Sequence, residues 1–250
     1  MERATKLEQM NTTFGARAVS QADRQSAVTD LFDRIAPRYD LMNDLMSFGT
    51  HRLWKRAAVA RAAALAGEVP ESVVDLAGGT GDLALALRKR LPKRRIVVAD
   101  ASAGMLEIAR ERGGAALDYL QTPAEALPFE DGSVALVTLS FGLRNMTDPA
   151  AALAEVARVL TPGGHLVLLE FSQPAAWFAP LYGLHARYVI PRIGAAVARD
   201  RGAYTYLVES IERFPGRADV ARAIAAAGLD LVAERAFVFG VARLQIGRKP

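Results

Sequence analysis

The chain has 250 residues, 51% of them hydrophobic, which is enough for one full core, and it contains no cysteine. The lack of cysteine excludes disulfides, thiolate metal ligands and cysteine nucleophiles, and it favours a reducing compartment. The formal net charge of +4 is small, so nucleic acid is not an expected partner, whereas an anionic membrane surface is compatible with it.

Residues 1–25 are polar and follow no regular period, which predicts a flexible N-terminal arm. No apolar segment follows the first residues, so we expect no secretory signal and a cytoplasmic protein. Residues 26–66 carry a helical pattern and predict a helical lid. Val28, Leu31 and Ile35 form one stripe that Pro37 ends, and a second helix is expected over residues 52–65.

The remaining chain alternates between short apolar runs and helical patterns, which predicts an α/β domain whose parallel sheet has helices on both faces. We expect one domain over residues 26–250. Ser102 and Asp148 are expected to cap two of the helices. Gly240 separates two final runs and predicts an antiparallel pair. The expected strands cover residues 73–77, 95–99, 117–120, 134–140, 165–169, 231–239 and 241–246.

Residues 173–214 interrupt this alternation and are rich in Trp, Phe and Tyr, so they predict a helical insertion after the fifth strand. The apolar stretch 175–198 within it is broken by Pro180, Pro191 and several charged residues, which argues against a membrane-spanning helix.

A glycine-rich turn follows the first expected strand and precedes a helical pattern. The run Gly79-Thr80-Gly81-Asp82-Leu83-Ala84 fits the dinucleotide fingerprint, and Asp100 at the end of the next strand lies near the distance expected of a ribose-binding acid. Gly79 and Gly81 let the backbone approach a ligand. This pattern alone leaves a nicotinamide-dependent dehydrogenase open.

Asp82 favours a different cofactor. A carboxylate at the start of the helix would repel a pyrophosphate, but Asp75 and Asp82 would attract the sulfonium and ammonium groups of S-adenosylmethionine. Asp100 could then accept both ribose hydroxyls. Asp82 could also be a solvent-facing acid in the first helical turn. Ser140 and Glu170 fall at the same edge of the sheet, and Glu170 is equally well explained as a structural hydrogen-bond partner.

Three stretches carry a resemblance to a known family. They are Tyr39-Asp40-x-Met42-Asn43-x-x-Met46-Ser47-x-x-x-His51-x-x-Trp54, then Leu76-Ala77-Gly78-Gly79-Thr80-Gly81-Asp82, and Ser140-Phe141-Gly142-Leu143-Arg144-Asn145. From about residue 11 onward the chain resembles the demethylmenaquinone and 2-polyprenyl-6-methoxy-1,4-benzoquinol C-methyltransferases of quinone biosynthesis. The resemblance implies a Rossmann-like class I methyltransferase fold with a seven-stranded, mostly parallel sheet, S-adenosylmethionine as cofactor, and a polyprenylated quinol as substrate.

Carried over by position, the resemblance implies cofactor contacts at Thr80, Asp100, Pro123, Ala124 and Ser140. The family usually has a polar residue where Pro123 stands, so only the backbone of Pro123 and Ala124 remains for the adenine. The family also usually has lysine at position 161, where this chain has threonine in a turn, and little functional effect is expected there.

The implied reaction needs a stabilised phenolate and a proton acceptor. Arg144 is expected to stabilise the oxyanion, Asn145 to hydrogen-bond a ring oxygen, and His51 to act as general base, although His51 could instead only pack under the lid. No metal site is expected, because His51, His165 and His185 lack a ligand-like spacing.

The polyprenyl tail requires an apolar route, and the lid and the aromatic insertion are the extra elements that could supply it or contact a membrane. Two other functions stay open: a methyltransferase of the same class acting on another small molecule, and a non-catalytic module that binds the cofactor. Ring type, tail length and the presence of a homodimer stay open as well.

Overall fold

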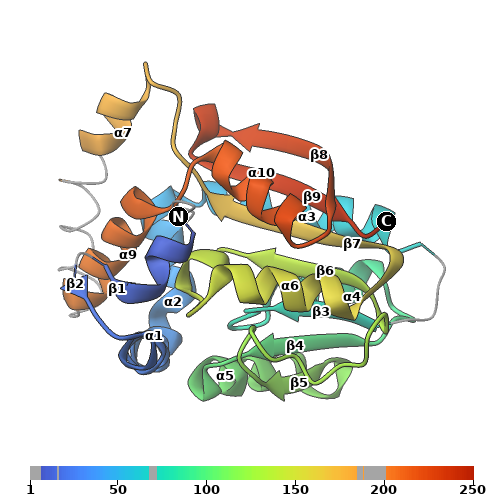
Figure 1. The fold of residues 1–250 in the computed structure, drawn as a ribbon. Coiled ribbons are helices and arrows are strands. Elements are labelled where there is room, and N and C mark those ends of the chain that lie inside the picture. Colours follow the sequence, from blue (N-terminus) through green and yellow to red (C-terminus); the bar gives the residue numbers. More distant parts are fainter. Residues whose placement is uncertain (1–6, 16, 68–71, 185–187, 189–200) are drawn as a thin grey trace.

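The molecule is built on a seven-stranded sheet with the order β5-β4-β3-β6-β7-β9-β8 (Figure 1). The computed structural model describes residues 7–15, 17–67, 72–184, 188 and 201–250. The strands from β5 to β7 run parallel, and β9 is antiparallel to both of its neighbours. The expected α/β class is therefore confirmed. The strands are β3 (Ser72–Leu76), β4 (Ile96–Asp100), β5 (Asp118–Gln121), β6 (Val134–Ser140), β7 (Leu160–Phe171), β8 (Asp230–Phe237) and β9 (Ala242–Arg248).

Helices cover both faces of this sheet. The helices α6 and α10 lie on one face, and α3, α4 and α5 lie on the other, as their buried residues show. Ser102 and Asp148 cap α5 and α6 as expected, each accepting hydrogen bonds from backbone N–H groups of the first turn. The helices are α1 (Gln21–Ile35), α2 (Tyr39–Ser47), α3 (Thr50–Leu65), α4 (Asp82–Arg90), α5 (Ala103–Gly113), α6 (Pro149–Val159), α7 (Ala179–Leu184), α9 (Arg201–Arg213) and α10 (Arg217–Ala226).

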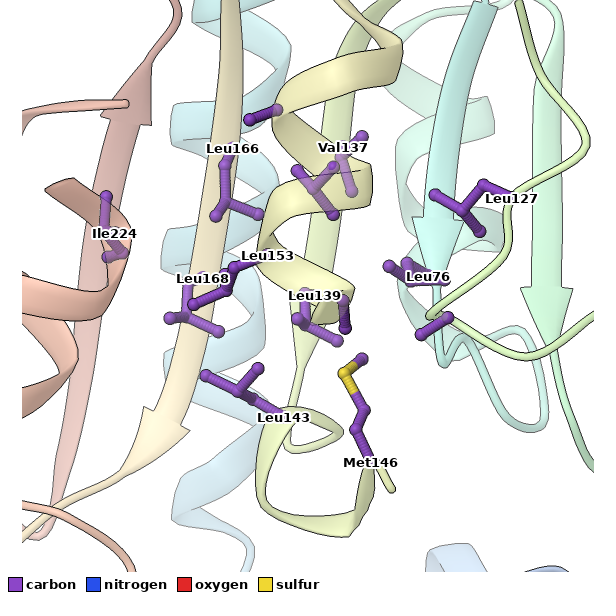
Figure 2. Close-up of a cluster of buried hydrophobic side chains, with 14 of the residues drawn as sticks. Leu76, Leu127, Val137, Leu139, Leu143, Met146, Leu153, Leu166, Leu168 and Ile224 are labelled. Carbon is purple, nitrogen blue, oxygen red and sulfur yellow. The ribbon is translucent and has the colours of Figure 1, made fainter. Parts of the chain in front are cut away.

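Alternating side chains of the strands divide the core between these two helical layers. In β6, Val137 and Leu139 face α6, whereas Leu136 belongs to the cluster under α3 and α4. Figure 2 shows Leu153 of α6 among Leu139, Leu166 and Leu168, all of them fully buried. Burial of one such leucine contributes about 2 kcal/mol. This packing fixes the strand ends that carry the polar residues.

The expected arm is wrong for the part of residues 1–25 that the structure describes. A 3₁₀ helix (Glu8–Thr12) leads into two short antiparallel strands, β1 (Thr13–Phe14) and β2 (Arg17–Ala18), and α1 already begins at Gln21. Leu7 is 1% exposed and Arg24 is 2% exposed. The Arg24 guanidinium donates to the carbonyl oxygens of Thr13 and Arg144. Residues 1–6 lie outside the described residues.

The lid and the later insertion pack against each other at one end of the sheet (Figure 1). Val28 and Leu31 of α1 share a buried cluster with Tyr206 and Leu207 of α9. This contact between α1 and α9 explains why both segments carry apolar stripes. Residues 185–187 and 189–200 of the expected insertion lie outside the described residues. No helix in the described part of the chain is long and apolar enough to cross a membrane.

Candidate functional site

The glycine-rich turn between β3 and α4 forms the centre of the site. Gly79 and Gly81 have φ angles of 56° and 77°, in the left-handed region that favours glycine. A Cβ atom on Gly78 would lie 2.9 Å from the carbonyl oxygen of Asp75, so only glycine fits there. Gly79 lines two cavities that border this turn.

Asp100 fixes the turn and lines the first of these cavities, which measures about 90 Å³. Its carboxylate accepts from the backbone N–H of Gly79 at 2.8 Å and from that of Ser102 at 2.9 Å. Burial raises the pKa of Asp100, more strongly than these N–H groups lower it. Each carboxylate oxygen can accept a second hydrogen bond, so Asp100 retains capacity for hydroxyl donors. Pro123, Ala124 and Asn145 line the same cavity.

The second cavity also borders the turn and measures about 30 Å³. Lys55, Asp75, Thr80, Asp82 and Ser140 supply its polar lining. The Ser140 hydroxyl is buried and has no hydrogen-bond partner in the described part of the chain. A ligand with adjacent nucleoside hydroxyls in the first cavity and a charged amino-acid group in the second would use both Asp100 and this orphaned hydroxyl. The residues present therefore fit S-adenosylmethionine.

Asp75 holds the sheet together beneath the second cavity. Its carboxyl oxygens accept from the Thr138 hydroxyl at 2.7 Å and from the Ala84 N–H at 3.1 Å. Burial raises the pKa of Asp75 to about 7. The expected attraction of this residue for the cofactor is therefore weakened, because its oxygens already join β3, β6 and α4.

Asp82 is already neutralised by cations of the chain. Lys55 lies 3.0 Å from one carboxylate oxygen and Arg112 lies 3.5 Å from the other. Burial acts to raise the pKa of Asp82, but Lys55 and Arg112 outweigh it and the pKa is lowered. Asp82 lines the second cavity, and these two cations were not expected from the sequence.

Thr80 and Gly81 both have structural roles. Thr80 also lines the second cavity, whereas Gly81 does not line either cavity. The Thr80 hydroxyl lies 3.1 Å from Asp40 Oδ1, and the Arg112 guanidinium donates to both Asp40 and Thr80. These bonds tie α2 of the lid to the turn. Gly81 lines neither cavity, and a Cβ there would lie 3.3 Å from that of Ala109, so Gly81 lets α4 pack against α5.

A third and much larger cavity of about 550 Å³ lies under the lid and α7. Its lining is almost wholly apolar and includes Trp54, Phe141, Phe171 and Tyr182. Phe141 lines all three cavities, so it separates the apolar cavity from the two beside the glycine turn.

The Phe141 backbone is held in a strained conformation. Its φ angle is 58°, which costs a non-glycine residue about 1–3 kcal/mol. Its N–H donates to the Leu169 carbonyl at 2.8 Å. Its carbonyl oxygen accepts from Arg144 Nη1 at 2.6 Å and from Asn145 Nδ2 at 3.2 Å. Three hydrogen bonds thus fix the ring between the cavities.

His51, the expected general base, lines the apolar cavity. The residue is 5% exposed, and its Nδ1 lies 2.8 Å from the Ser47 hydroxyl. Burial, and then the charge of Lys55, lower the pKa of His51. The imidazole is therefore neutral at pH 7 and able to take up a proton.

The structure places Arg144 and Asn145 differently from the sequence expectation. Arg144 is 3% exposed, lines neither the apolar cavity nor the first one, and donates to Glu170 Oε1 at 2.7 Å. Since Glu170 neutralises its charge, a direct contact with a substrate oxyanion is not what the geometry favours. Asn145 lines the first cavity rather than the apolar one, and its Oδ1 accepts from the Tyr206 hydroxyl at 3.1 Å.

Sequence reasoning missed two residues of the site. Lys55 follows the first resembling stretch directly, and Phe141 stands inside the third. The signal for Lys55 was a basic residue four positions after His51, which puts both on one face of a helix. Phe141 gave no such signal, because its position between cavities depends on the whole fold.

Solved structures of other proteins share the fold of this chain. Solved structures that share the fold include the geranyl diphosphate C-methyltransferase of Streptomyces coelicolor A3(2), with a TM-score of 0.57 and 16% identity over 82% of each chain. A SAM-dependent methyltransferase of Aquifex aeolicus matches with a TM-score of 0.56 and 16% identity, over 77% of this chain and 89% of that one.

Sequence relatives carry the comparison further. The ubiquinone/menaquinone biosynthesis C-methyltransferase UbiE of Rubrivivax gelatinosus is 47% identical, over 96% of this chain and 94% of the relative. UbiE of Xylella fastidiosa is 45% identical, over 97% of this chain and 98% of the relative. The model of the ubiE/COQ5 methyltransferase family matches residues 19–249, with the glycine turn, Asp100 and the lid all inside the match. The chain therefore belongs to the ubiE/COQ5 methyltransferase family.

Proposed function

We propose that the chain methylates a ring carbon of a polyprenylated quinol, with S-adenosylmethionine as methyl donor. Its reactions are the conversion of demethylmenaquinol to menaquinol and that of 2-polyprenyl-6-methoxy-1,4-benzoquinol to its 3-methyl product, either or both. The observation that carries the proposal is the apolar cavity of about 550 Å³ that meets the cofactor cavities at Phe141. Such a cavity suits an aromatic ring with an isoprenoid tail. The quinone-biosynthesis names of the relatives support this substrate class.

The cofactor residues divide between the two cavities. Asp100 would accept from the ribose hydroxyls, and the backbone of Pro123 and Ala124 would border the adenine. Ser140 would meet the amino-acid group. When bound, S-adenosylmethionine supplies a methyl group on a positively charged sulfur, and the ring carbon that takes this methyl must lose one proton.

We assign the acceptance of that proton to His51. With the Ser47 hydroxyl donating its single proton to the Asn43 carbonyl at 2.7 Å, Ser47 accepts from His51 Nδ1–H, and we assign this tautomer to the imidazole. This leaves Nε2 as the proton acceptor on a side chain that lines the cavity. Burial raises the pKa of Tyr182 to about 12, so its phenol stays protonated and can donate to a ring oxygen.

We assign an indirect role to Arg144 and Asn145. Both donate to the Phe141 carbonyl, and both therefore hold the ring that stands between donor and acceptor cavities. Positioning of this kind supplies several kcal/mol of the barrier reduction in well-oriented reactions, on the order of 7–11 in the best cases. Glu170 orients Arg144 in turn.

We further propose that the mouth of the apolar cavity meets a membrane surface. Phe48, Leu181 and Leu184 line the cavity and are 71%, 62% and 56% exposed. Trp177 and Phe239 contact each other edge to face beside this mouth and are 68% and 58% exposed. An exposed apolar rim around an apolar cavity would let an isoprenoid tail pass from lipid to the ring site.

One experiment tests the main proposal. The purified protein is supplied with S-adenosylmethionine labelled in its methyl group and with each of the two reduced quinones. We expect label on a ring carbon of at least one quinol, because the cavity accepts both rings by its apolar lining. Label on neither quinol, with the cofactor bound, would favour another small-molecule substrate. Failure to bind S-adenosylhomocysteine would contradict the cofactor assignment itself.

A further inference from the structure

Lys55 carries a cation into the second cavity from the lid side. It lies on α3 one turn after His51, and its side chain is 13% exposed. It is the one cationic side chain among the described residues that line this cavity, and the other charged groups there are Asp75 and Asp82. A lysine so far from water needs anionic partners.

Asp82 satisfies Lys55 only in part. It accepts one hydrogen bond from Nζ at 3.0 Å, whereas an ammonium has three N–H donors. Asp82 is also shared with Arg112, and its side chain is 41% exposed at the surface side of the cavity. Lys55 therefore has donor capacity toward an anion inside the cavity.

The order of the cavities identifies that anion. With the ribose hydroxyls on Asp100, the nucleoside end of the cofactor would occupy the first cavity, and Gly79 lines both that cavity and the second one. The amino-acid end, which carries a carboxylate and an ammonium group, then falls in the second cavity. The buried Ser140 hydroxyl without a partner is an independent sign that a polar ligand group belongs there.

We propose that Lys55 is the anchor for the carboxylate of the cofactor's amino-acid end. Held in the second cavity by this anchor, the amino-acid end would direct the sulfur toward Phe141, which lines both this cavity and the apolar one. The proposal rests on the cofactor of the proposed function and is independent of the quinol substrate. It also explains why the lid helix that bears His51 reaches the glycine turn at all.

Ligands that differ only in the amino-acid end test this anchor by calorimetry. The probes are S-adenosylhomocysteine, its decarboxylated analogue, and 5′-methylthioadenosine, which lacks the whole amino-acid end. Lys55→Gln should weaken S-adenosylhomocysteine roughly ten- to a hundredfold, the range of a charge-assisted hydrogen bond. The same variant should bind the decarboxylated analogue and 5′-methylthioadenosine as the wild type does, within about twofold.

Two controls make the result decisive. Lys89→Gln removes an exposed lysine at the end of α4 and should change none of the three affinities. Asp100→Asn should weaken all three ligands alike, because all carry the ribose. Unchanged 5′-methylthioadenosine binding also shows that Lys55→Gln is folded. Equal losses for all three ligands, or none for S-adenosylhomocysteine, would overturn the anchor and leave the proposed function standing.

Discussion

Asp75 makes the stability of this protein depend on pH. Burial raises its pKa from 3.8 to about 7, although Thr138 and Ala84 donate to it. The carboxyl group therefore binds its proton more tightly in the folded chain than in the unfolded chain. The stability that it contributes is fully present below about pH 4 and is lost as the pH rises to about 7. A difference of about three pH units, at about 1.4 kcal/mol per unit, corresponds to about 4 kcal/mol at most.

Asp75→Asn should remove this dependence. The asparagine can accept from Ala84 N–H and donate to the Thr138 oxygen, because that hydroxyl can rotate and act as acceptor. We expect the variant to be less stable than or equal to the wild type at pH 4.5, and to gain relative to it as the pH approaches 8. The measurement is urea unfolding of both proteins at a series of pH values, with a constant ionic strength.

Thr138→Val serves as the matched control, since it removes the partner and keeps the acid. The unfolding free energy of Thr138→Val should depend on pH as strongly as that of the wild type, or more strongly, because one group that lowers the Asp75 pKa is gone. Parallel curves of unfolding free energy for the wild type and Asp75→Asn between pH 4.5 and 8 would refute the assigned pKa and the reasoning behind it.

Three other predictions concern the apolar side of the site. His51→Gln should lower kcat about 100-fold or more. The wild-type rate should fall only below pH 6.5, because the pKa of His51 is lowered. A fall in rate with decreasing pH that begins above pH 7 and is retained in His51→Gln would exclude His51 as the base. Glu170→Gln should lower the unfolding free energy by about 3 kcal/mol, because Arg144 keeps its buried charge without an anionic partner, and a loss under 1 kcal/mol in urea would contradict that pairing. Trp177→Asp with Phe239→Asp should abolish co-sedimentation with anionic lipid vesicles at unchanged unfolding temperature, and undiminished sedimentation would reject the membrane rim.

The sequence by itself determined the layout of the fold, and its resemblance to a known family indicated the cofactor. Alternating apolar runs and helical patterns specify a helix-covered parallel sheet, because strand and helix periods differ and each element must bury its apolar side. Asp100 was located by the rule that strand ends border the ligand crevice, and it lies where that rule puts it. These signals lie within short segments of the chain, so they can be recognised without knowing how the segments pack together.

Tertiary structure alone decided which charges are available for chemistry. Arg144 looked like a cation for an oxyanion, but Glu170 lies 26 residues further along and neutralises it. Asp82 looked like an anion for the cofactor, but Lys55 arrives from the lid. The strained Phe141 became the partition between cavities only because two polar neighbours and β7 hold its backbone. Electrostatic and steric roles depend on distances between residues remote in the chain, and no local pattern encodes those distances.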